Sequence, residues 1–471
     1  MRRSTGTGAG TAPGDATDTG TVRVMAADTA AAVADRLRDP AHVAELTGSR
    51  MAALPADLML PGWQPASLTL GHPGMALLHS RRARDDDAWN EVVHGHLSAA
   101  VTAAARAGAA SAGDLFLAAR LHADVAGGYA RLLTRSADVL ASFATAHAAR
   151  LEQRIAEADF GLSYMDYDVL AGLAGQGRVL LLAAEHGHAP GAEALRRVLG
   201  CLVALTRPVR VGGATVPGWW CAPDRYVVPR DRTTFPQGDL NVGAAHGICG
   251  PLALLSLAAL AGYGVPGTLP AVRHITDWVL AKERADEWGG YWPGRVSFEE
   301  ETGVAPGPAP AKPGAGWCYG SSGVALALDH AGRALGDPTV RARALAAMRA
   351  ACRRPLDDGA GLDLGFCHGR AGTLHAAVRM AAATEDAELW DAATRTARDV
   401  AAAYDPRLPF GYRQAVRTEA GTTFVDSPGL VDGATGIALA LLGYADACGA
   451  GPGETGGAAE AGSWDAAFLV A

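Results

Sequence analysis

One frame of glycine and apolar residues recurs along the chain. It consists of a short lead-in, the pattern Gly-x-x-Gly and an apolar run with helical spacing. The copies are GHPGMALLH at 71, GLAGQGRVLLLAA at 172, GICGPLALLSLA at 247, GSSGVALALDHAG at 320, GRAGTLHAAVRMAA at 369 and GATGIALALLGYA at 433. Because these runs are almost entirely small or aliphatic, we expect each to form a helix that is buried on every side.

Amphipathic segments lie between these frames. DPTVRARALAAMRAACRR at 337 and DAELWDAATRTARDVAAAY at 386 carry their charges at helical spacing. GDLFLAARLHADVAGGYARLL at 113 falls in the long gap between the first two frames and is a candidate for a degenerate seventh copy. A buried helix followed by an amphipathic helix, repeated about seven times, predicts an all-α protein with an α/α toroid fold. Inner helices would line the centre of the ring and outer helices would cover them.

An open α-solenoid is the alternative to a closed ring. The frames are unevenly spaced, and two irregular inserts rich in Pro and Gly interrupt them at 206–239 and 287–316. Both features favour the toroid over a regular solenoid. Each insert precedes a frame with polar residues, so we expect long loops that cover a binding face.

Composition and charge restrict the class of protein further. The 471 residues are 49% apolar, and the net charge of −8 argues against nucleic acid or an anionic membrane as the partner. The longest apolar stretch, PLALLSLAALAGYG, is too short for a membrane span, and no apolar run follows the two N-terminal Arg. We therefore expect a disordered leader over 1–25, one toroid domain over 26–471 and a cytoplasmic location. The seven scattered cysteines favour reduced thiols, some of them bound to metal.

The lead-ins carry the candidate metal ligands. The residues two positions before the first glycine of each frame are Thr69, Leu170, Ala245, Cys318, Cys367 and Val431. If the repeats are equivalent, Cys318 and Cys367 lie at neighbouring helix entrances, where His368 can reach the same spot before the helix begins. Two thiolates and one imidazole would form a three-ligand Zn²⁺ site with an open fourth position, as in catalytic zinc sites. Buried Cys and His that only pack are the alternative, and the matched positions of the two Cys count against it.

Other polar residues of the frames are candidates for catalysis. His246 occupies the same frame position as His368, and it suits general acid/base work or a hydrogen bond inside the ring. Asp168 precedes its frame glycine by four residues, where it can orient an imidazole or cap the helix. Tyr319 can donate to a developing oxyanion or simply pack. Asp432 also lies in a frame, and we interpret it as structural.

The motifs AHGICG, WCYGSSG and CHGRAG, in that order, resemble the three signature motifs of the LanC family of lanthionine synthetase cyclases. YDVLAGLAG resembles the earlier Asp-bearing segment of the family and GLVDGATGIALALL its last repeat, so the resemblance runs from about residue 66 to the C-terminal SWDAAFLVA. It implies a toroid of seven inner and seven outer helices. It also implies one Zn²⁺ per chain, held by Cys318, Cys367 and His368.

The resemblance further implies a reaction. Members of the family close thioether rings in a dehydrated precursor peptide, in which Cys thiolates add to dehydroalanine or dehydrobutyrine. By this pattern His246 matches the general acid/base, and Asp168 and Tyr319 match assisting residues. The family usually has an Arg four residues before the first ligand Cys, where this chain has Gly314; whether Lys312 replaces that Arg stays open. The sequence carries no nucleotide-binding loop, so we expect a separate dehydratase as partner.

Other classes of function remain as alternatives. The first is a different thiol-transfer enzyme on the same zinc, such as a LanC-like protein that adds glutathione or a distant prenyltransferase-like toroid. Prenyltransferase-type ligation uses Asp with Cys and His, so the two matched cysteines count against that version. The second is a non-catalytic scaffold that binds peptides. A glycosidase would need paired central carboxylates, and the frames supply no clear pair.

Overall fold

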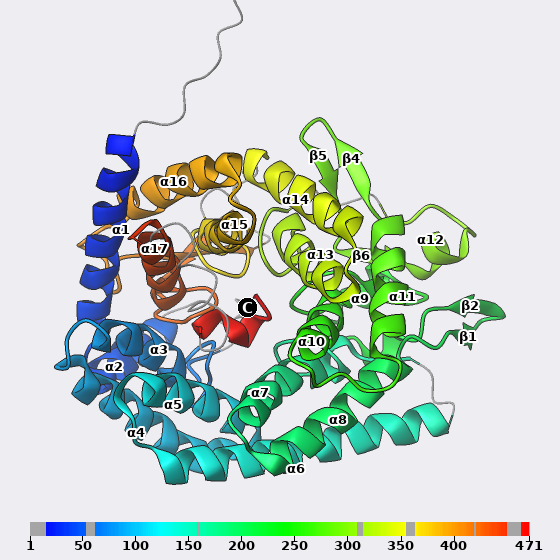
Figure 1. Ribbon diagram of the computed structural model, residues 1–471, viewed down its shortest axis with the longest axis horizontal. Coiled ribbons are helices and arrows are strands. Elements are labelled where there is room, and N and C mark those ends of the chain that lie inside the picture. The colour runs from blue at the N-terminus through cyan, green and yellow to red at the C-terminus, as the bar shows by residue number, and fades with distance from the viewer. Residues whose placement is uncertain are drawn as a thin grey trace, which may run out of the picture.

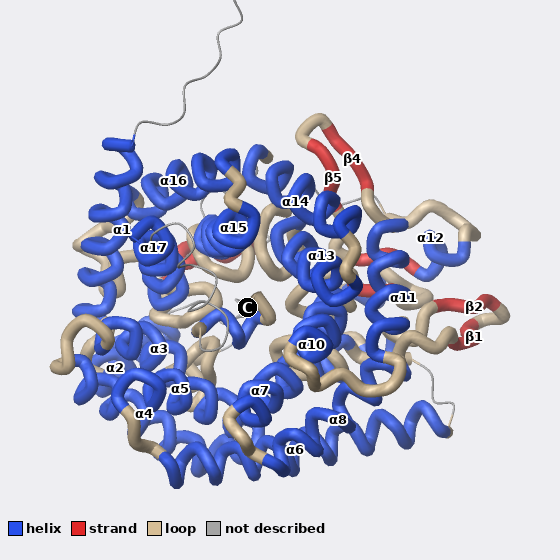
Figure 2. The backbone as a smooth tube through the Cα atoms, viewed as in Figure 1, coloured by secondary structure: helices blue, strands red, loops and turns tan. Residues whose placement is uncertain are grey.

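The computed structural model shows a ring of helices in two concentric layers (Figure 1, Figure 2). It describes residues 16–52, 62–157, 161–308, 314–354, 363–418, 421–449 and 463–470. The inner helices are α3 (His72–Ala83), α5 (Ala112–Ala126), α7 (Leu173–Glu185), α10 (Cys249–Leu260), α13 (Ser321–Leu335), α15 (Arg370–Thr384) and α17 (Ala434–Gly449). The outer helices are α4 (Trp89–Ala107), α6 (Ala130–Ala156), α8 (Ala189–Ala204), α11 (Thr268–Ala281), α14 (Pro338–Arg353), α16 (Ala387–Ala402) and α1 (Ala16–Arg36). The predicted all-α toroid with seven inner and seven outer helices is therefore confirmed in the described part of the chain.

The first helix of the chain closes the ring. α1 packs against α17, so the outer partner of the last inner helix comes from the N-terminal end of the sequence (Figure 1). Val22, Ala26 and Ala30 of α1 are almost completely buried. The leader expected over 1–25 overlaps this helix, so residues 16–25 are helical and not disordered. Residues 1–15 lie outside the described residues. A short helix, α2 (Pro40–Ala52), follows α1.

The glycine frames mark close contact between each inner helix and its own lead-in. A Cβ at Gly372, the second glycine of its frame, would overlap the carbonyl oxygen of Phe366, six residues earlier. One at Gly436 would overlap the carbonyl oxygen of Leu430 in the same way. Only glycine lets the lead-in fold back this tightly onto the first turn of the helix.

The two Pro- and Gly-rich inserts carry about half of the small amount of β-structure in the described residues. The strands form antiparallel pairs, which are β1 (Val209–Val211) with β2 (Ala214–Val216), β3 (Asp239–Asn241) with β6 (Arg295–Ser297), β4 (Arg284–Asp286) with β5 (Gly289–Tyr291), and β7 (Gln414–Thr418) with β8 (Gly421–Val425). Of these strands, β1, β2, β5 and β6 lie within the inserts. The β3–β6 pair joins the two inserts, with Asp239 opposite Ser297. Asp239 is fully buried and accepts hydrogen bonds from Arg295 Nε at 2.5 Å and from the Tyr226 hydroxyl at 2.7 Å.

Short elements complete the described structure. They are α9 (Asp231–Thr234), α12 (Phe298–Thr302), and the 3₁₀ turns η1 (Gly108–Ser111), η2 (Tyr164–Asp166), η3 (Pro223–Arg225) and η5 (Trp464–Phe468). The main hydrophobic core extends around the whole ring, from Val22 to Val470. Among the described helices, none has the length and apolar character needed to cross a membrane.

Candidate active site

The lead-ins hydrogen-bond to one another around the centre of the ring. The N–H of Cys318 donates to the carbonyl of Cys367 at 3.1 Å, and the N–H of Cys367 donates to the carbonyl of Val431 at 2.9 Å. Each bond joins the same position of two neighbouring frames. Cys318 and Cys367 are therefore held side by side because their repeats are equivalent.

The same pattern continues on both sides of the cysteines. The N–H of Ala244 donates to the carbonyl of Cys318 at 2.8 Å, and that of Val169 to the carbonyl of Ala245 at 2.9 Å. On the other side, the N–H of Leu430 donates to the carbonyl of Thr69 at 2.8 Å. These bonds place the lead-in that carries His246 between the lead-in that carries Asp168 and the one that carries Cys318.

The three predicted ligands converge. The Sγ atoms of Cys318 and Cys367 and one ring nitrogen of His368 all lie within 4.8 Å of one another. Both cysteines are buried, whereas the His368 side chain is 56% exposed. The imidazole thus forms the open side of the cluster, where a further ligand could approach.

The electrostatics of the cluster favour an anionic sulfur. Burial opposes ionisation of Cys318, but its hydrogen bond with Cys367 and the positive charge of His368 lower the pKa of its thiol to about 5. The hydrogen bond to Cys318, together with burial, raises the pKa of Cys367. Burial also opposes protonation of His368, but the Cys318 thiolate and the Asp432 carboxylate raise its pKa to about 11. The two sulfurs, of which that of Cys318 ionises more readily, and the imidazole are donors that fit Zn²⁺.

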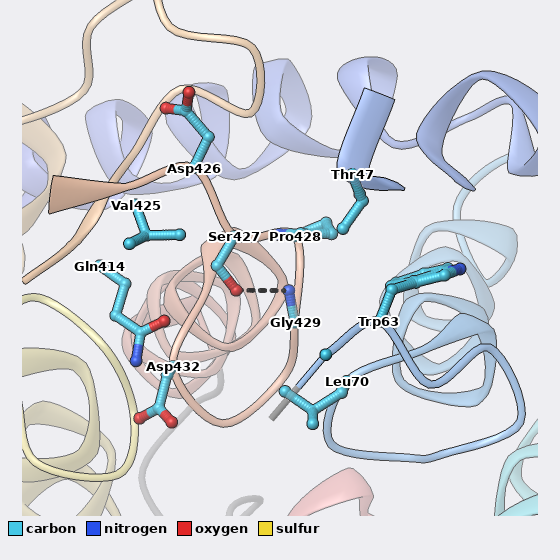
Figure 3. Close-up of a pocket in the computed structure, with 11 residues that line it drawn as sticks. Thr47, Trp63, Leu70, Gln414, Val425, Asp426, Ser427, Pro428, Gly429 and Asp432 are labelled. Carbon is cyan, nitrogen blue, oxygen red and sulfur yellow. Dashed lines mark hydrogen bonds between the residues drawn. The ribbon is translucent and has the colours of Figure 1, made fainter. Parts of the chain in front are cut away.

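The carboxylates of Asp363 and Asp432 lie beside the His368 imidazole. The sequence analysis did not connect either of them with His368. His368 Nδ1 is 3.5 Å from Asp432 Oδ1 and 3.9 Å from Asp363 Oδ2. Asp432 Oδ1 is buried and has no hydrogen-bond partner among the described residues. Figure 3 shows Asp432 on the wall of a pocket, with Gln414 beside it and Leu70 across from it. The interpretation of Asp432 as a purely structural residue is therefore incomplete. Asp432 directly precedes the first glycine of its frame, as His368 does, and this shared position was the available signal.

His246 and Asp168 form a pair next to this cluster. His246 Nδ1 lies 2.6 Å from Asp168 Oδ2, and Asp168 is fully buried. Asp168 Oδ1 accepts the N–H groups of Ala171 and Gly172, each at 2.7 Å. One oxygen of Asp168 thus binds the lead-in of α7 and the other faces the imidazole, whereas the N-cap of α7, Gly172, has no side-chain cap hydrogen bond. That Asp168 orients the imidazole during a reaction stays a prediction. The carboxylate favours the proton on Nδ1, which leaves Nε2 for exchange with a substrate.

The ring of Tyr319 also lies near the imidazole of His246. The two ring centroids are 6.0 Å apart, and the Tyr164 ring packs on His246 at 4.9 Å. The Tyr319 hydroxyl accepts a hydrogen bond from Asn241 Nδ2 at 2.9 Å, and burial raises the pKa of Tyr319. Asn241 lies on β3 and was missed, since nothing in its local sequence distinguishes it from a turn residue.

At the position where the family usually has an Arg, four residues before Cys318, this chain has Gly314. Gly314 is exposed, and its carbonyl accepts a hydrogen bond from the N–H of Ser321 at 3.1 Å. Lys312 lies outside the described residues, so whether it replaces the Arg stays open.

Comparisons with known proteins identify the class. The family model described as "Lanthionine synthetase C-like protein" matches residues 62–447, so the chain belongs to this family. Among solved structures, nisin cyclase matches with a TM-score of 0.67 and 18% sequence identity, over 87% of this chain and 93% of nisin cyclase. At that identity the likeness shows the fold. A search of curated protein sequences finds no match.

Proposed function

We propose that the protein is a zinc-dependent lanthionine cyclase. It adds Cys thiolates of a dehydrated lanthipeptide precursor to dehydroalanine or dehydrobutyrine and so forms thioether rings. The observation that carries this proposal is the convergence of Cys318, Cys367 and His368 within 4.8 Å, beside the His246–Asp168 pair. Membership of the LanC-like family supports it.

The cluster would hold one Zn²⁺ per chain. Two sulfurs and an imidazole leave a fourth position, on the exposed side of His368. When bound, zinc would lower the pKa of a substrate thiol from about 8.5, so that the thiolate exists at neutral pH. Burial of both cysteines shields the two sulfurs from water.

The residues of the chain account for the proton balance. The substrate sulfur forms a bond to the β-carbon, and the electron pair of the C=C bond moves to the α-carbon and its carbonyl. Nε2 of His246 would deliver a proton to the α-carbon, while Asp168 stabilises the imidazolium and fixes its orientation. The Tyr319 hydroxyl would face the charge that develops on the carbonyl oxygen. The proton lost by the thiol replaces the one that His246 gives.

The reaction requires dehydrated Ser or Thr residues, which a separate dehydratase would supply. None of the seven cysteines is paired in a disulfide, which is typical of a reducing compartment such as the cytoplasm. The cyclase and a dehydratase would then act on the same peptide in the cytoplasm.

The decisive experiment measures zinc and ring closure together. Zinc per chain is determined for wild type, Cys318→Ala, Cys367→Ala and the control Cys201→Ala, which removes a buried thiol on the outer helix α8. We expect one zinc in wild type and in the control and none in the two site variants. The same proteins are then given a synthetic peptide that contains dehydroalanine and Cys, and separately glutathione with a dehydroalanine peptide.

Each outcome separates the candidate functions. Ring closure lost with the zinc supports the cyclase. Glutathione addition without ring closure would support the LanC-like thiol-addition enzyme. Zinc retained in both site variants, or absent from a folded wild type, would contradict the metal site and leave the peptide-binding scaffold.

A further inference from the structure

The chain of hydrogen bonds between lead-ins breaks at one place in the ring. Leu430 and Leu68 both stand three residues before the first glycine of their frames. The N–H of Leu430 donates to the backbone carbonyl of Thr69, as the pattern requires. The N–H of Leu68 instead donates to a side chain, Asp114 Oδ2, at 2.8 Å. A carboxylate thus substitutes for the carbonyl of a missing lead-in.

The break coincides with the degenerate seventh repeat. Asp114 lies in the first turn of α5, the inner helix between α3 and α7 in the ring. The chain enters α5 through the 3₁₀ turn η1, without the Gly-x-x-Gly lead-in of the other inner helices. Among the described residues, no loop therefore fills the space between Thr69 and Leu170, where a seventh lead-in would lie.

A pocket of about 590 Å³ occupies this space. Its floor is apolar and includes the buried side chains of Leu117, Leu140 and Phe468. Met165 and Leu170 also line it and are 43% and 40% exposed, which is unusual for large apolar side chains in this protein. Its size is that of a ligand-binding site, and beside the apolar floor it has polar lining residues that include His147, Arg150, Arg154 and Gln176.

The pocket shares lining residues with the lead-in that holds Asp168. Ala171 and Gly172 line it, and their N–H groups bind the Asp168 carboxylate that orients His246. Met165 follows Tyr164, whose ring packs on His246. One wall thus serves both the pocket and the acid/base pair.

Asp114 is the polar group at the α5 side of the pocket. Its Oδ2 binds Leu68, and within the described ranges it forms no ion pair with a cation. Burial raises the pKa of this carboxyl to about 7, although the hydrogen bond from Leu68 opposes the shift. A carboxyl group with one oxygen unused can accept an N–H from a bound molecule.

We propose that this pocket is a peptide subsite that takes an apolar segment next to the reacting residue of the substrate, with Asp114 accepting one of its backbone N–H groups. The occupant follows from position, because the pocket shares a wall with the acid/base pair, and from its apolar floor. The inference rests on the proposed function for the identity of the substrate. It adds a site that grips the peptide away from the metal cluster.

The test uses binding, so that it does not depend on ring closure. Three labelled decapeptides, each with one Cys flanked by Leu, by Lys or by Glu and with Ala in place of dehydroalanine, are titrated with the full-length protein. Ala110→Trp places a ring in the pocket, because exposed Ala110 lines it. Ala109→Trp is the matched control, since Ala109 is equally exposed in the same turn and does not line the pocket. Asp114→Asn keeps an oxygen for Leu68 and removes the charge.

We expect the Leu-flanked peptide to bind most tightly and Ala110→Trp to weaken it by about tenfold or more, about 1.4 kcal/mol. Ala109→Trp should stay within about twofold of wild type, and Asp114→Asn should weaken binding less than Ala110→Trp, because it removes one hydrogen-bond acceptor and leaves the pocket open. Equal binding by wild type and Ala110→Trp, equal loss in both Trp variants, or no wild-type binding at about 1 mM peptide would overturn the subsite. If the peptide binds in this pattern but ring closure is absent, the subsite stands and the proposed cyclase fails.

Discussion

Asp168 joins the backbone of its own helix entrance to the imidazole of His246, which is 78 residues away in sequence. Its Oδ1 binds two N–H groups and its Oδ2 lies 2.6 Å from His246 Nδ1. The carboxylate is therefore held at both oxygens, and its contact with Nδ1 restricts the orientation of the imidazole. A positioned base of this kind needs little reorganisation during a proton transfer.

Replacement of Asp168 by Asn should slow ring closure strongly. The amide removes the negative charge that stabilises an imidazolium and can present an N–H to Nδ1, which selects the wrong tautomer. We expect kcat to fall by about 10²–10⁴-fold, the usual range for loss of general acid/base catalysis. The rate is measured on a dehydrated peptide over a range of pH, with Asp138→Asn as control, because Asp138 is 54% exposed and pairs with His188 at the outer surface. Equal rates for wild type and Asp168→Asn would contradict the role of Asp168 in stabilising the His246 imidazolium.

Replacement of Asp432 by Asn should weaken zinc binding. Asp432 Oδ1 lies 3.5 Å from His368 Nδ1, and a carboxylate next to a ligand imidazole orients it and makes it more basic. We expect the affinity for zinc to fall by about 10–100-fold, measured by competition with a chromophoric chelator. Asp426→Asn is the matched control, because Asp426 lines the same pocket but pairs with Arg413 and Arg50. An unchanged affinity in Asp432→Asn would mean that Asp432 does not act on the ligand.

The protein should lose stability in mild acid because of three buried histidines. His72 Nδ1 lies 3.1 Å from His96 Nδ1, and the Nε2 atoms of His79 and His96 bind the carbonyl of Leu37 at 3.1 and 2.9 Å. Burial lowers the pKa of His72 and of His79 to about 4, and that of His96 well below its usual value. The unfolded chain, with histidine pKa values of about 6.5, then binds more protons than the folded chain.

The free energy of unfolding should therefore decrease as the pH falls from about 6.5 towards 4, by about 2 kcal/mol at pH 5 for each of His72 and His79, and His96 acts in the same direction. Urea unfolding at pH 7 and pH 5 measures the change. His79→Gln retains a donor for Leu37 and cannot titrate, so it should lose less stability than wild type over the same interval. The same pH dependence in both proteins would show that His79 is not neutral in the folded state.

Asp114 should act in the opposite direction on the pH scale. Its folded pKa of about 7 lies above the value of about 3.9 expected in the unfolded chain, so its ionisation opposes folding. This effect is absent below pH 4, grows as the pH rises and is complete above about pH 7. Asp114→Asn removes it, and we expect the melting temperature of the variant relative to wild type to be higher at pH 8 than at pH 5. A constant difference between the two proteins at both pH values would contradict the buried carboxyl.

Much of the site could be predicted because it repeats. The Gly-x-x-Gly frames recur with the same local geometry, so the alignment of the chain with itself placed Cys318 and Cys367 at equivalent positions, and the structure brings them together with His368. Asp168 and His246 could be proposed for the same reason. What a repeat shares with its neighbours is local, and local geometry follows from the order of residues.

Other features depend on closure of the ring and were not predictable. The sequence by itself determined the inner helices, their glycine entrances and the side chains carried there, because tight lead-ins require glycine and buried helices require small apolar residues. Only the tertiary structure decided that α1 covers α17, that Asp432 faces His368, that Asn241 reaches Tyr319 and that Asp114 spans the break in the ring. The physical reason is that these contacts join segments far apart in the chain, and their positions are set by how all the helices pack around one centre.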